Sequence, residues 1–161
     1  MSKIFFSSDI IDFLFLLSKH KVKYLIVGGE AVIYYGHARL TGDIDVFYDR
    51  EKENSTKLFK ALNEFWDDDI PGITKKKELQ KKGEIFQFGV PPNRIDLINE
   101  IKNVHFDEAY ENKIKDKITN KRKKFTIYYI GLKELIKNKK AINRFKDKED
   151  LKFLQELIKR K

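Results

Sequence analysis

The chain has 161 residues, 41% of them hydrophobic and 13% aromatic, which is enough material for one core of moderate size. It contains no cysteine, and this excludes disulfides, thiolate metal ligands and a cysteine nucleophile. The formal net charge is +9, and it is concentrated in residues 102–161, which hold 19 basic against 9 acidic residues.

This basic C-terminal half would suit a polyanionic partner such as RNA, DNA or a nucleotide. Codon bias is the alternative explanation, because the chain has 28 lysines but only 6 arginines. Nucleic-acid surfaces usually favour arginine for its planar, forked donors. Composition alone leaves both interpretations open.

The first predicted element is an amphipathic helix over residues 8–19, with apolar residues at positions 10, 11, 14, 15 and 17. Asp9 and Asp12 interrupt the apolar N-terminal stretch, and no small-residue cleavage site follows before His20. No segment approaches the ~20 apolar residues that a membrane helix needs. We therefore expect a cytoplasmic protein that does not associate with membranes.

The next elements alternate between short strands and helices. Residues 22–27 form a buried, β-branched run that Gly28-Gly29 break, and a short helix is predicted over 30–35. A second strand is predicted over 44–48, and helical spacing follows over 54–66.

The second half contains a polar segment, further strands and closing helices. We expect an exposed loop or frayed helix at 67–82, a hairpin of 84–90 with 94–98, a polar helix at 106–117, a strand at 125–130, and helices at 132–142 and 147–158. This order predicts an α/β (α+β) fold with a small mixed sheet flanked by helices. We expect one domain over residues 1–161 that ends in a helical hairpin at about 132–159.

Asp43 and Asp45 are the first candidates for chemistry. They lie one residue apart on the predicted second strand, so their side chains point to the same face. Two neighbouring carboxylates repel each other unless a cation lies between them. Gly28 and Gly29 end the preceding strand, and glycines at a helix start offer bare backbone N–H groups to an anion. A metal site beside a phosphate cradle predicts phosphoryl or nucleotidyl transfer.

Asp96 is the third acidic candidate, because it lies mid-strand among apolar neighbours where an unpaired carboxylate is costly. If its strand lies beside that of Asp43 and Asp45, the three carboxylates converge and would hold Mg²⁺ or Mn²⁺ as catalytic metal. The alternative is a salt bridge from Asp96 to Arg94 or Arg39.

Four further residues are candidates for nucleotide binding. Arg39 would hold a phosphate, and Thr41 would fix the loop or a metal-bound water, although both also fit a surface arginine and a turn residue. Lys139 and Arg144 in the closing helices would face the triphosphate. The acidic residues nearby, such as Asp147, either pair with these cations or stabilise a helix start.

Several motifs together resemble the polymerase-beta-like nucleotidyltransferase superfamily. They are Gly28-Gly-Glu-Ala31, Arg39-Leu-Thr-Gly-Asp-Ile-Asp45, Arg94-Ile-Asp96, and an ending that runs from Leu135-Ile-Lys-Asn-Lys139 through Arg144-Phe-Lys-Asp147 to Asp150-Leu151. Within the superfamily, the chain is similar to the minimal bacterial nucleotidyltransferases, a group that includes abortive-infection toxin-like proteins. The resemblance covers roughly residues 20–155.

The resemblance implies a role for each matching residue. Asp43, Asp45 and Asp96 would be the metal-binding catalytic carboxylates, Gly28 and Gly29 would lie at the nucleotide phosphates, and Lys139 would contact a phosphate. Many relatives carry Gly-Ser at the glycine turn, and the serine contacts phosphate. Here Gly29 and Glu30 stand instead, so that hydroxyl is missing.

The leading functional hypothesis is a metal-dependent transferase that moves a nucleoside monophosphate from an NTP onto a hydroxyl of RNA, protein or a small molecule. It is consistent with a toxin–antitoxin component that has a partner antitoxin. The alternative is a non-catalytic nucleotide- or RNA-binding module with the same fold. A third possibility is a purely structural network of aspartates in an unrelated α/β domain.

Overall fold

The computed structural model describes residues 6–121 and 123–160 of the chain. Six α-helices and one 3₁₀ helix lie in this part, namely α1 (Ser8–Lys19), α2 (Gly28–Tyr34), α3 (Lys52–Phe65), η1 (Lys76–Gln80), α4 (Phe106–Glu111), α5 (Leu132–Ile142) and α6 (Phe145–Lys159). The strands are β1 (Tyr24–Val27), β2 (Asp43–Tyr48), β3 (Ile85–Phe88), β4 (Arg94–Ile98), β5 (Ile114–Asn120) and β6 (Lys123–Tyr129).

The strands form one mixed sheet in the order β3-β4-β2-β1-β6-β5. Neighbours β3 and β4, β2 and β1, and β6 and β5 are antiparallel, whereas β2 and β4, and β1 and β6, are parallel. With helices on both sides, this is the mixed α+β fold that the sequence predicted, and it is consistent with a nucleotidyltransferase-like architecture.

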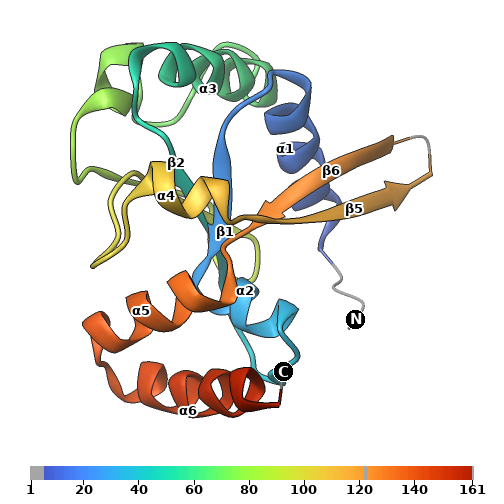
Figure 1. The fold of residues 1–161 in the computed structure, drawn as a ribbon. Coiled ribbons are helices and arrows are strands. Elements are labelled where there is room, and N and C mark those ends of the chain that lie inside the picture. Colours follow the sequence, from blue (N-terminus) through green and yellow to red (C-terminus); the bar gives the residue numbers. More distant parts are fainter. Residues whose placement is uncertain (1–5, 122, 161) are drawn as a thin grey trace.

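Apart from α4, which lies over the middle of the sheet, the helices gather in two groups at opposite ends of the strands (Figure 1). The group with α1 and α3 packs its apolar faces inward, and Ile10, Phe13, Leu14 and Leu17 of α1 are buried. Helix α1 begins behind Ser7, whose Oγ accepts a hydrogen bond from the Ile10 N–H at 3.3 Å. All four residues of β1 are buried, so this strand runs through the middle of the core.

The second group consists of α5 and α6, which follow each other almost directly. Asn143 lies between them with φ of 57°, a left-handed conformation that ends α5. The connection is short, so α6 folds back beside α5 (Figure 1). These two helices lie near α2, next to the glycines that follow β1 (Figure 1).

One predicted element is wrong in its second half. The helix expected at 106–117 ends at Glu111, and residues 114–120 form strand β5, which pairs with β6 along its whole length. The alternation of Ile114 and Ile118 with exposed lysines was the signal for a strand. The segment joins the sheet because β6 satisfies its backbone hydrogen bonds, and this outweighs a weak helical pattern.

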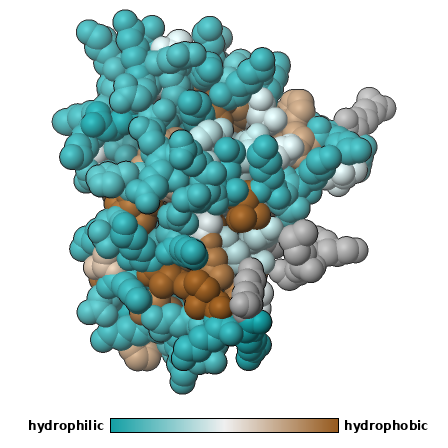
Figure 2. All heavy atoms as spheres, viewed as in Figure 1, coloured by the Kyte–Doolittle hydropathy of each residue, from teal (hydrophilic) through white to brown (hydrophobic). Residues whose placement is uncertain are grey.

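The outer surface is mostly polar, with apolar side chains gathered over α5 in the view of Figure 2. Three large apolar residues are strongly exposed: Leu40 in the loop after α2, Val90 in the loop before β4, and Phe145 at the start of α6. Within the described residues, no helix has both the length and the apolar composition needed to span a bilayer.

Candidate active site

Strands β2 and β4 bring three carboxylates together on one face of the sheet. The strands are parallel neighbours, and Asp45 is the Cα partner of Asp96. Asp43 and Asp45 are half-buried and Asp96 is buried. One oxygen from each of the three side chains lies within 4.8 Å of the others. The convergence that the sequence predicted is therefore present, because β4 does lie beside β2.

Arg94 occupies the space between two of these carboxylates. Its Nη2 is 2.8 Å from Asp43 Oδ2, and its Nε is 3.0 Å from Asp96 Oδ1. The salt bridge that was the alternative explanation for Asp96 is thus also present. The guanidinium shows that the cluster accommodates a positive charge at this position. Thr41 adds a hydrogen bond, because its Oγ1 donates to Asp43 Oδ1 at 3.1 Å.

The cluster raises and lowers the pKa values of its members unequally. Burial, and then the negative charges of Asp43 and Asp96, raise the pKa of Asp45 to about 7. Burial also raises the pKa of Asp96, although the hydrogen bond from Arg94 opposes this. Burial opposes ionisation of Asp43 as well, but hydrogen bonds involving Asp96, Arg94 and Thr41 lower its pKa overall. Asp43 is therefore the carboxylate most readily charged without a metal.

The glycine turn at the start of α2 lies directly against the carboxylates. Gly28 has φ of +65°, and a Cβ added there would fall 2.1 Å from Asp45 Oδ2. A Cβ at Gly29 would fall 2.8 Å from Thr41 Oγ1. Only glycine leaves this space open and adopts this backbone without strain. Glu30 follows, and burial together with the charge of Asp43 raises its pKa to about 7.

The opposite wall of the site comes from α5 and α6, where a buried ion network joins distant segments. Lys139 Nζ lies 2.8 Å from Asp147 Oδ1 and 3.0 Å from Asp150 Oδ2, and all three side chains are buried. Arg39, from the loop before β2, donates to Asp150 Oδ2 at 2.5 Å. Arg144 Nε donates to Asp147 Oδ2 at 2.7 Å. The network fixes the C-terminal helices against the loop that carries Thr41.

Asp147 has both of the roles considered from the sequence, since it stabilises a helix start and pairs with cations. It accepts from the backbone N–H of Arg144 at 3.2 Å, as a residue in the first turn of α6. It also pairs with Lys139 and Arg144, and these partners outweigh burial and lower its pKa to about 2. Lys139 is buried and already bound by two carboxylates. The cations at this wall that are exposed are Arg144 and Lys146.

These walls enclose a cleft of about 430 Å³. All nine residues predicted from the sequence line it, namely Gly28, Gly29, Arg39, Thr41, Asp43, Asp45, Asp96, Lys139 and Arg144. The sequence interpretation missed five polar lining residues, Gln87, Glu100, Lys102, Asn138 and Lys146. Lys146 stands inside the Arg144–Asp147 motif and could have been found there. Lys102 follows β4 without any motif to mark it.

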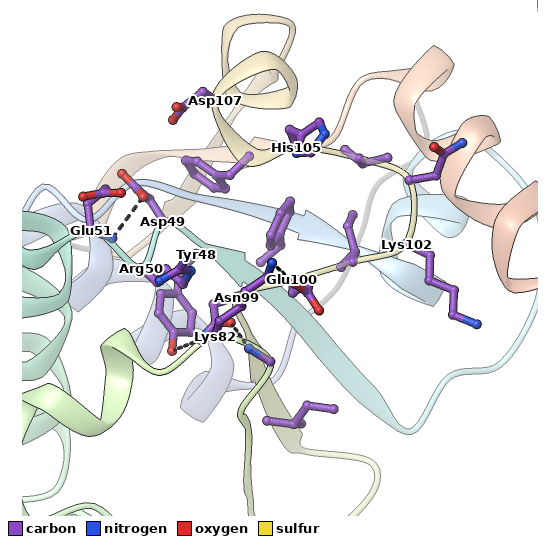
Figure 3. Close-up of a pocket in the computed structure, with 17 residues that line it drawn as sticks. Tyr48, Asp49, Arg50, Glu51, Lys82, Asn99, Glu100, Lys102, His105 and Asp107 are labelled. Atoms are coloured by element: carbon purple, nitrogen blue, oxygen red, sulfur yellow. Dashed lines mark hydrogen bonds and ion pairs between the residues drawn. The ribbon is translucent and has the colours of Figure 1, made fainter.

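A second cavity of about 720 Å³ adjoins the cleft on the side of α4 (Figure 3). The two share the lining residues Ile85, Glu100, Ile101 and Lys102. In the close-up, the turn that carries His105 and Asp107 lies across the cavity from Arg50 and Lys82 (Figure 3). Asn99 holds one wall through hydrogen bonds to Tyr48 Oη and to the carbonyl of Lys81, both at 3.0 Å. The space next to the carboxylates therefore continues beyond a nucleotide-sized cleft.

The residues present fit a divalent cation. Three carboxylates offer hard oxygen ligands at a spacing that one or two ions can bridge, and this is the preferred donor set of Mg²⁺. Burial, and then the negative charges of Asp43 and Asp96, raise the pKa of Asp45, and a bound cation would oppose both effects. The neighbouring glycines leave room for an anion to approach.

Comparison with known proteins places this geometry in a family. Residues 8–160 match a family model whose description is a nucleotidyltransferase of unknown function (DUF6036). The chain belongs to this nucleotidyltransferase family. Membership supports the general assignment as a transferase. The matched residues include both the acidic strands and the C-terminal helices. No curated protein matches the chain.

Proposed function

We propose that this nucleotidyltransferase family member is a metal-dependent enzyme of the polymerase-beta-like superfamily. It would move a nucleoside monophosphate from an NTP onto a hydroxyl group. The observation that carries the proposal is the convergence of Asp43, Asp45 and Asp96 on one face of the sheet, directly against the Gly28-Gly29 turn. A ligand set for a cation and an opening for phosphate then share one cleft.

Asp43, Asp45 and Asp96 would hold Mg²⁺ or Mn²⁺. Bound there, the metal would supply Lewis-acid stabilisation of charge on the phosphates and a lower pKa for the acceptor hydroxyl. Arg94 already balances part of the carboxylate charge, and it would have to give up at least one of its contacts when a cation binds. Its exposed position allows it to turn toward the leaving phosphates, since its side chain is 31% exposed.

The triphosphate would lie between the glycine turn and the C-terminal helices. Gly28 and Gly29 let the phosphates approach the backbone closely, while Arg144 and Lys146 supply positive charge from the other side. Arg39 and Lys139 act mainly through the ion network that holds this wall in place. The acceptor oxygen would form a bond to the α-phosphorus while its proton passes to solvent. The bond between the α-phosphorus and the bridging oxygen would break, and pyrophosphate would leave with that electron pair.

A transfer assay tests the proposal. Purified protein is incubated with each α-labelled NTP, Mg²⁺ or Mn²⁺, and total RNA or cell lysate. We expect label on a macromolecule or small molecule with the wild type and none with Asp43→Asn/Asp45→Asn. Asp69→Asn is the matched control, since it removes an exposed acidic side chain away from the cleft. Absence of transfer from every NTP to every acceptor fraction would contradict the proposal.

The position of Arg94 favours a second candidate function. A guanidinium that bridges two of the three carboxylates could replace the metal altogether, and the chain would then be a non-catalytic nucleotide- or RNA-binding module. In that case Asp43→Asn would leave the cellular phenotype unchanged, while removal of basic surface residues would abolish it.

The finer relationship to abortive-infection toxin-like proteins, with a partner antitoxin, is also part of the proposal. Its test is whether the product of a neighbouring gene co-purifies with the chain and suppresses its transfer activity. Suppression without binding, or binding without suppression, would argue against a toxin–antitoxin pair.

A further inference from the structure

Strands β5 and β6 form a ribbon that projects from the body of the molecule (Figure 1). They pair along seven positions, and Lys115 lies opposite Tyr128, Lys117 opposite Thr126, and Lys124 opposite Thr119. Directly opposed residues share one face of a sheet. One side of the ribbon is therefore polar and basic, while Phe125, Ile127 and Tyr129 on the other side are buried.

We name Lys113, Lys115, Lys117 and Lys124 the lysine face. Lys115, Lys117 and Lys124 are exposed, and Lys113 immediately precedes β5. Within residues 6–121 and 123–160, none of the four has a carboxylate within ion-pair distance. Asp116, the acidic residue of this strand, has its side chain on the opposite side of the ribbon. The positive charge of the lysine face is therefore not neutralised by the protein.

Two tyrosines interleave with these lysines. Lys113 Nζ lies 4.0 Å from the ring centroid of Tyr110 and 5.8 Å from that of Tyr128. The two rings are 6.2 Å apart, and each is partly exposed. Aromatic rings among cations are the arrangement that single-stranded nucleic acids use for base stacking beside their phosphates.

The lysine face and the catalytic carboxylates lie on the same face of the sheet. Val27 of β1 pairs with Asp45, and its neighbour Ile26 pairs with Tyr129 of β6. Side chains alternate along a strand, so Tyr128 points to the same side as Val27 and Asp45. Helix α4 covers this side between the two regions, and its Phe106 contacts Phe47 while its Tyr110 contacts Tyr128.

The second cavity extends from the cleft to the start of α4, the helix whose Tyr110 contacts Tyr128 of the ribbon. It shares four lining residues with the cleft, and its far end is formed by the first residues of α4, from His105 to Asp107. Tyr110 lies one turn further along the same helix. A chain-like ligand whose end is in the cleft can thus continue through the second cavity and across α4 to the ribbon.

From these observations, we infer that the lysine face binds the phosphate backbone of a single-stranded RNA whose hydroxyl is the acceptor. The inference rests on the proposed transfer reaction, and it names the acceptor class. Cations without a carboxylate partner favour a polyanion, and the rings of Tyr110 and Tyr128 favour a polyanion that carries bases. RNA also offers a 2′-hydroxyl on each nucleotide as well as its terminal hydroxyls. Lysine is a point charge without forked donors, so recognition depends little on sequence.

Equilibrium binding tests this without any chemistry. A labelled single-stranded RNA of about 16 nucleotides is titrated with full-length protein in EDTA, without NTP, at several salt concentrations. Lys115→Gln/Lys117→Gln/Lys124→Gln is expected to weaken binding by roughly tenfold or more at ~0.1 M salt. It should also lower the salt slope of log K by about 2, since each phosphate contact contributes about 0.7.

Two matched variants distinguish an effect of the location of these lysines from an effect of the protein's net charge. Lys60→Gln/Lys76→Gln/Lys77→Gln removes the same charge from exposed residues of α3 and η1, and it is expected to change affinity by less than roughly threefold. Lys115→Arg/Lys117→Arg/Lys124→Arg keeps the charge and should bind like the wild type. Thermal melts verify that all variants are folded.

Some outcomes would overturn the inference. Equal losses of RNA affinity in the two glutamine variants would show that only the net charge of the protein matters. Failure of the arginine variant to bind RNA would contradict the electrostatic explanation. Equal binding of a DNA of the same sequence would overturn the choice of RNA. NMP transfer to a non-RNA acceptor, without RNA binding, would overturn this inference but leave the proposed enzyme standing. RNA binding through the lysine face without any transfer would overturn the proposed enzyme and the acceptor role of the RNA, and would leave only the RNA-binding surface standing.

Discussion

Arg94 is the residue that most directly links folding to the proposed chemistry. It stands two positions before Asp96 on β4, and Asp43 is its Cα partner on β2. Its guanidinium thereby neutralises part of a charge cluster that would otherwise oppose folding. A metal that binds the same carboxylates competes with Arg94, so loss of this side chain should affect stability and metal affinity in opposite directions.

Arg94→Gln tests this competition. The metal-free protein should melt at a lower temperature at pH 8, because Asp43 and Asp96 lose their counter-ion. Its affinity for Mn²⁺ should rise by roughly threefold or more, since the ion no longer displaces a bound cation. Mn²⁺ titration followed by electron paramagnetic resonance measures the affinity directly. A weaker affinity would identify Arg94 as a support of the metal site.

Asp45→Asn should stabilise the metal-free protein at high pH. Burial raises the pKa of Asp45 from its ordinary value of 3.8 to about 7, so the folded state binds the proton more tightly than the unfolded state. The stability of the wild type therefore falls as pH rises between these two values, and the loss is complete above about pH 7. In EDTA at pH 8, Asp45→Asn should raise the free energy of unfolding by about 2 kcal/mol.

The same substitution should change little near pH 4, where Asp45 is protonated in the folded wild type. Thermal melts of both proteins across this pH range provide the measurement. A constant difference at all pH values would assign the effect to packing, and a destabilised variant at pH 8 would contradict the burial of charge at this site. Transfer activity should be lost at every pH, because a metal ligand is removed.

At the scale of elements, the sequence predicted the parts with strong periodicity and missed the part that depends on a partner. Helix α1 and strand β1 carry their own signals in apolar spacing and β-branched residues. Strand β5 was predicted as the end of a helix, because the alternation of two isoleucines with lysines is a weak signal and the strand is stabilised mainly by its pairing with β6. The acidic pair was visible as Asp-x-Asp, whereas its closeness to Asp96 depended on β4 lying beside β2.

The role of the closing helices illustrates the same limit. Lys139 was expected to face the phosphates, and it does line the cleft. The sequence suggested that the nearby aspartates pair with these cations, but not that the ammonium of Lys139 is buried between Asp147 and Asp150. That burial depends on how α6 folds against α5 and on Arg39 from far earlier in the chain.

Lys139→Met measures the contribution of this network to the junction of α5 and α6. Methionine fills a similar volume but leaves Asp147 with Arg144, and Asp150 with Arg39 and the more distant His37. We expect a loss of about 2–3 kcal/mol in the free energy of unfolding by urea, because a buried pair has lost one member. Lys140→Met, at the exposed neighbouring position, should cost less than ~0.5 kcal/mol. Equal effects would show that the buried network contributes nothing.

At the scale of the whole molecule, the sheet has a firm centre and a loosely attached ribbon. Strand β1 pairs with β2 at four positions but with β6 at only one, Ile26 with Tyr129. The ribbon is therefore held mainly by its own pairing and by side-chain contacts such as that of Phe15 with Phe125. Such a segment can adjust to a ligand without disturbing the cleft.

Native-state hydrogen exchange should resolve this difference. Amides of β5 and of the outer half of β6 are expected to exchange through local opening, well before those of β1 and β2, which should exchange only with global unfolding. Time-resolved exchange read by mass spectrometry of peptides, or residue by residue by NMR, provides the test. Equal protection in β5 and β2 would mean that the ribbon and the centre form one cooperative unit.

The ion network also sets an order of events during synthesis of the chain. The three carboxylates are made by residue 96, whereas Lys139, Arg144 and Lys146 are added much later. A growing chain therefore acquires the ligands for a metal before it acquires the cations that line the opposite wall. Arg39 cannot form its ion pair until Asp150 has been synthesised, and until then this contact does not hold the loop that carries Thr41. If the carboxylates hold a metal as proposed, the nascent protein would acquire its metal site before its nucleotide site, and competence for transfer would arise only when α6 closes the cleft.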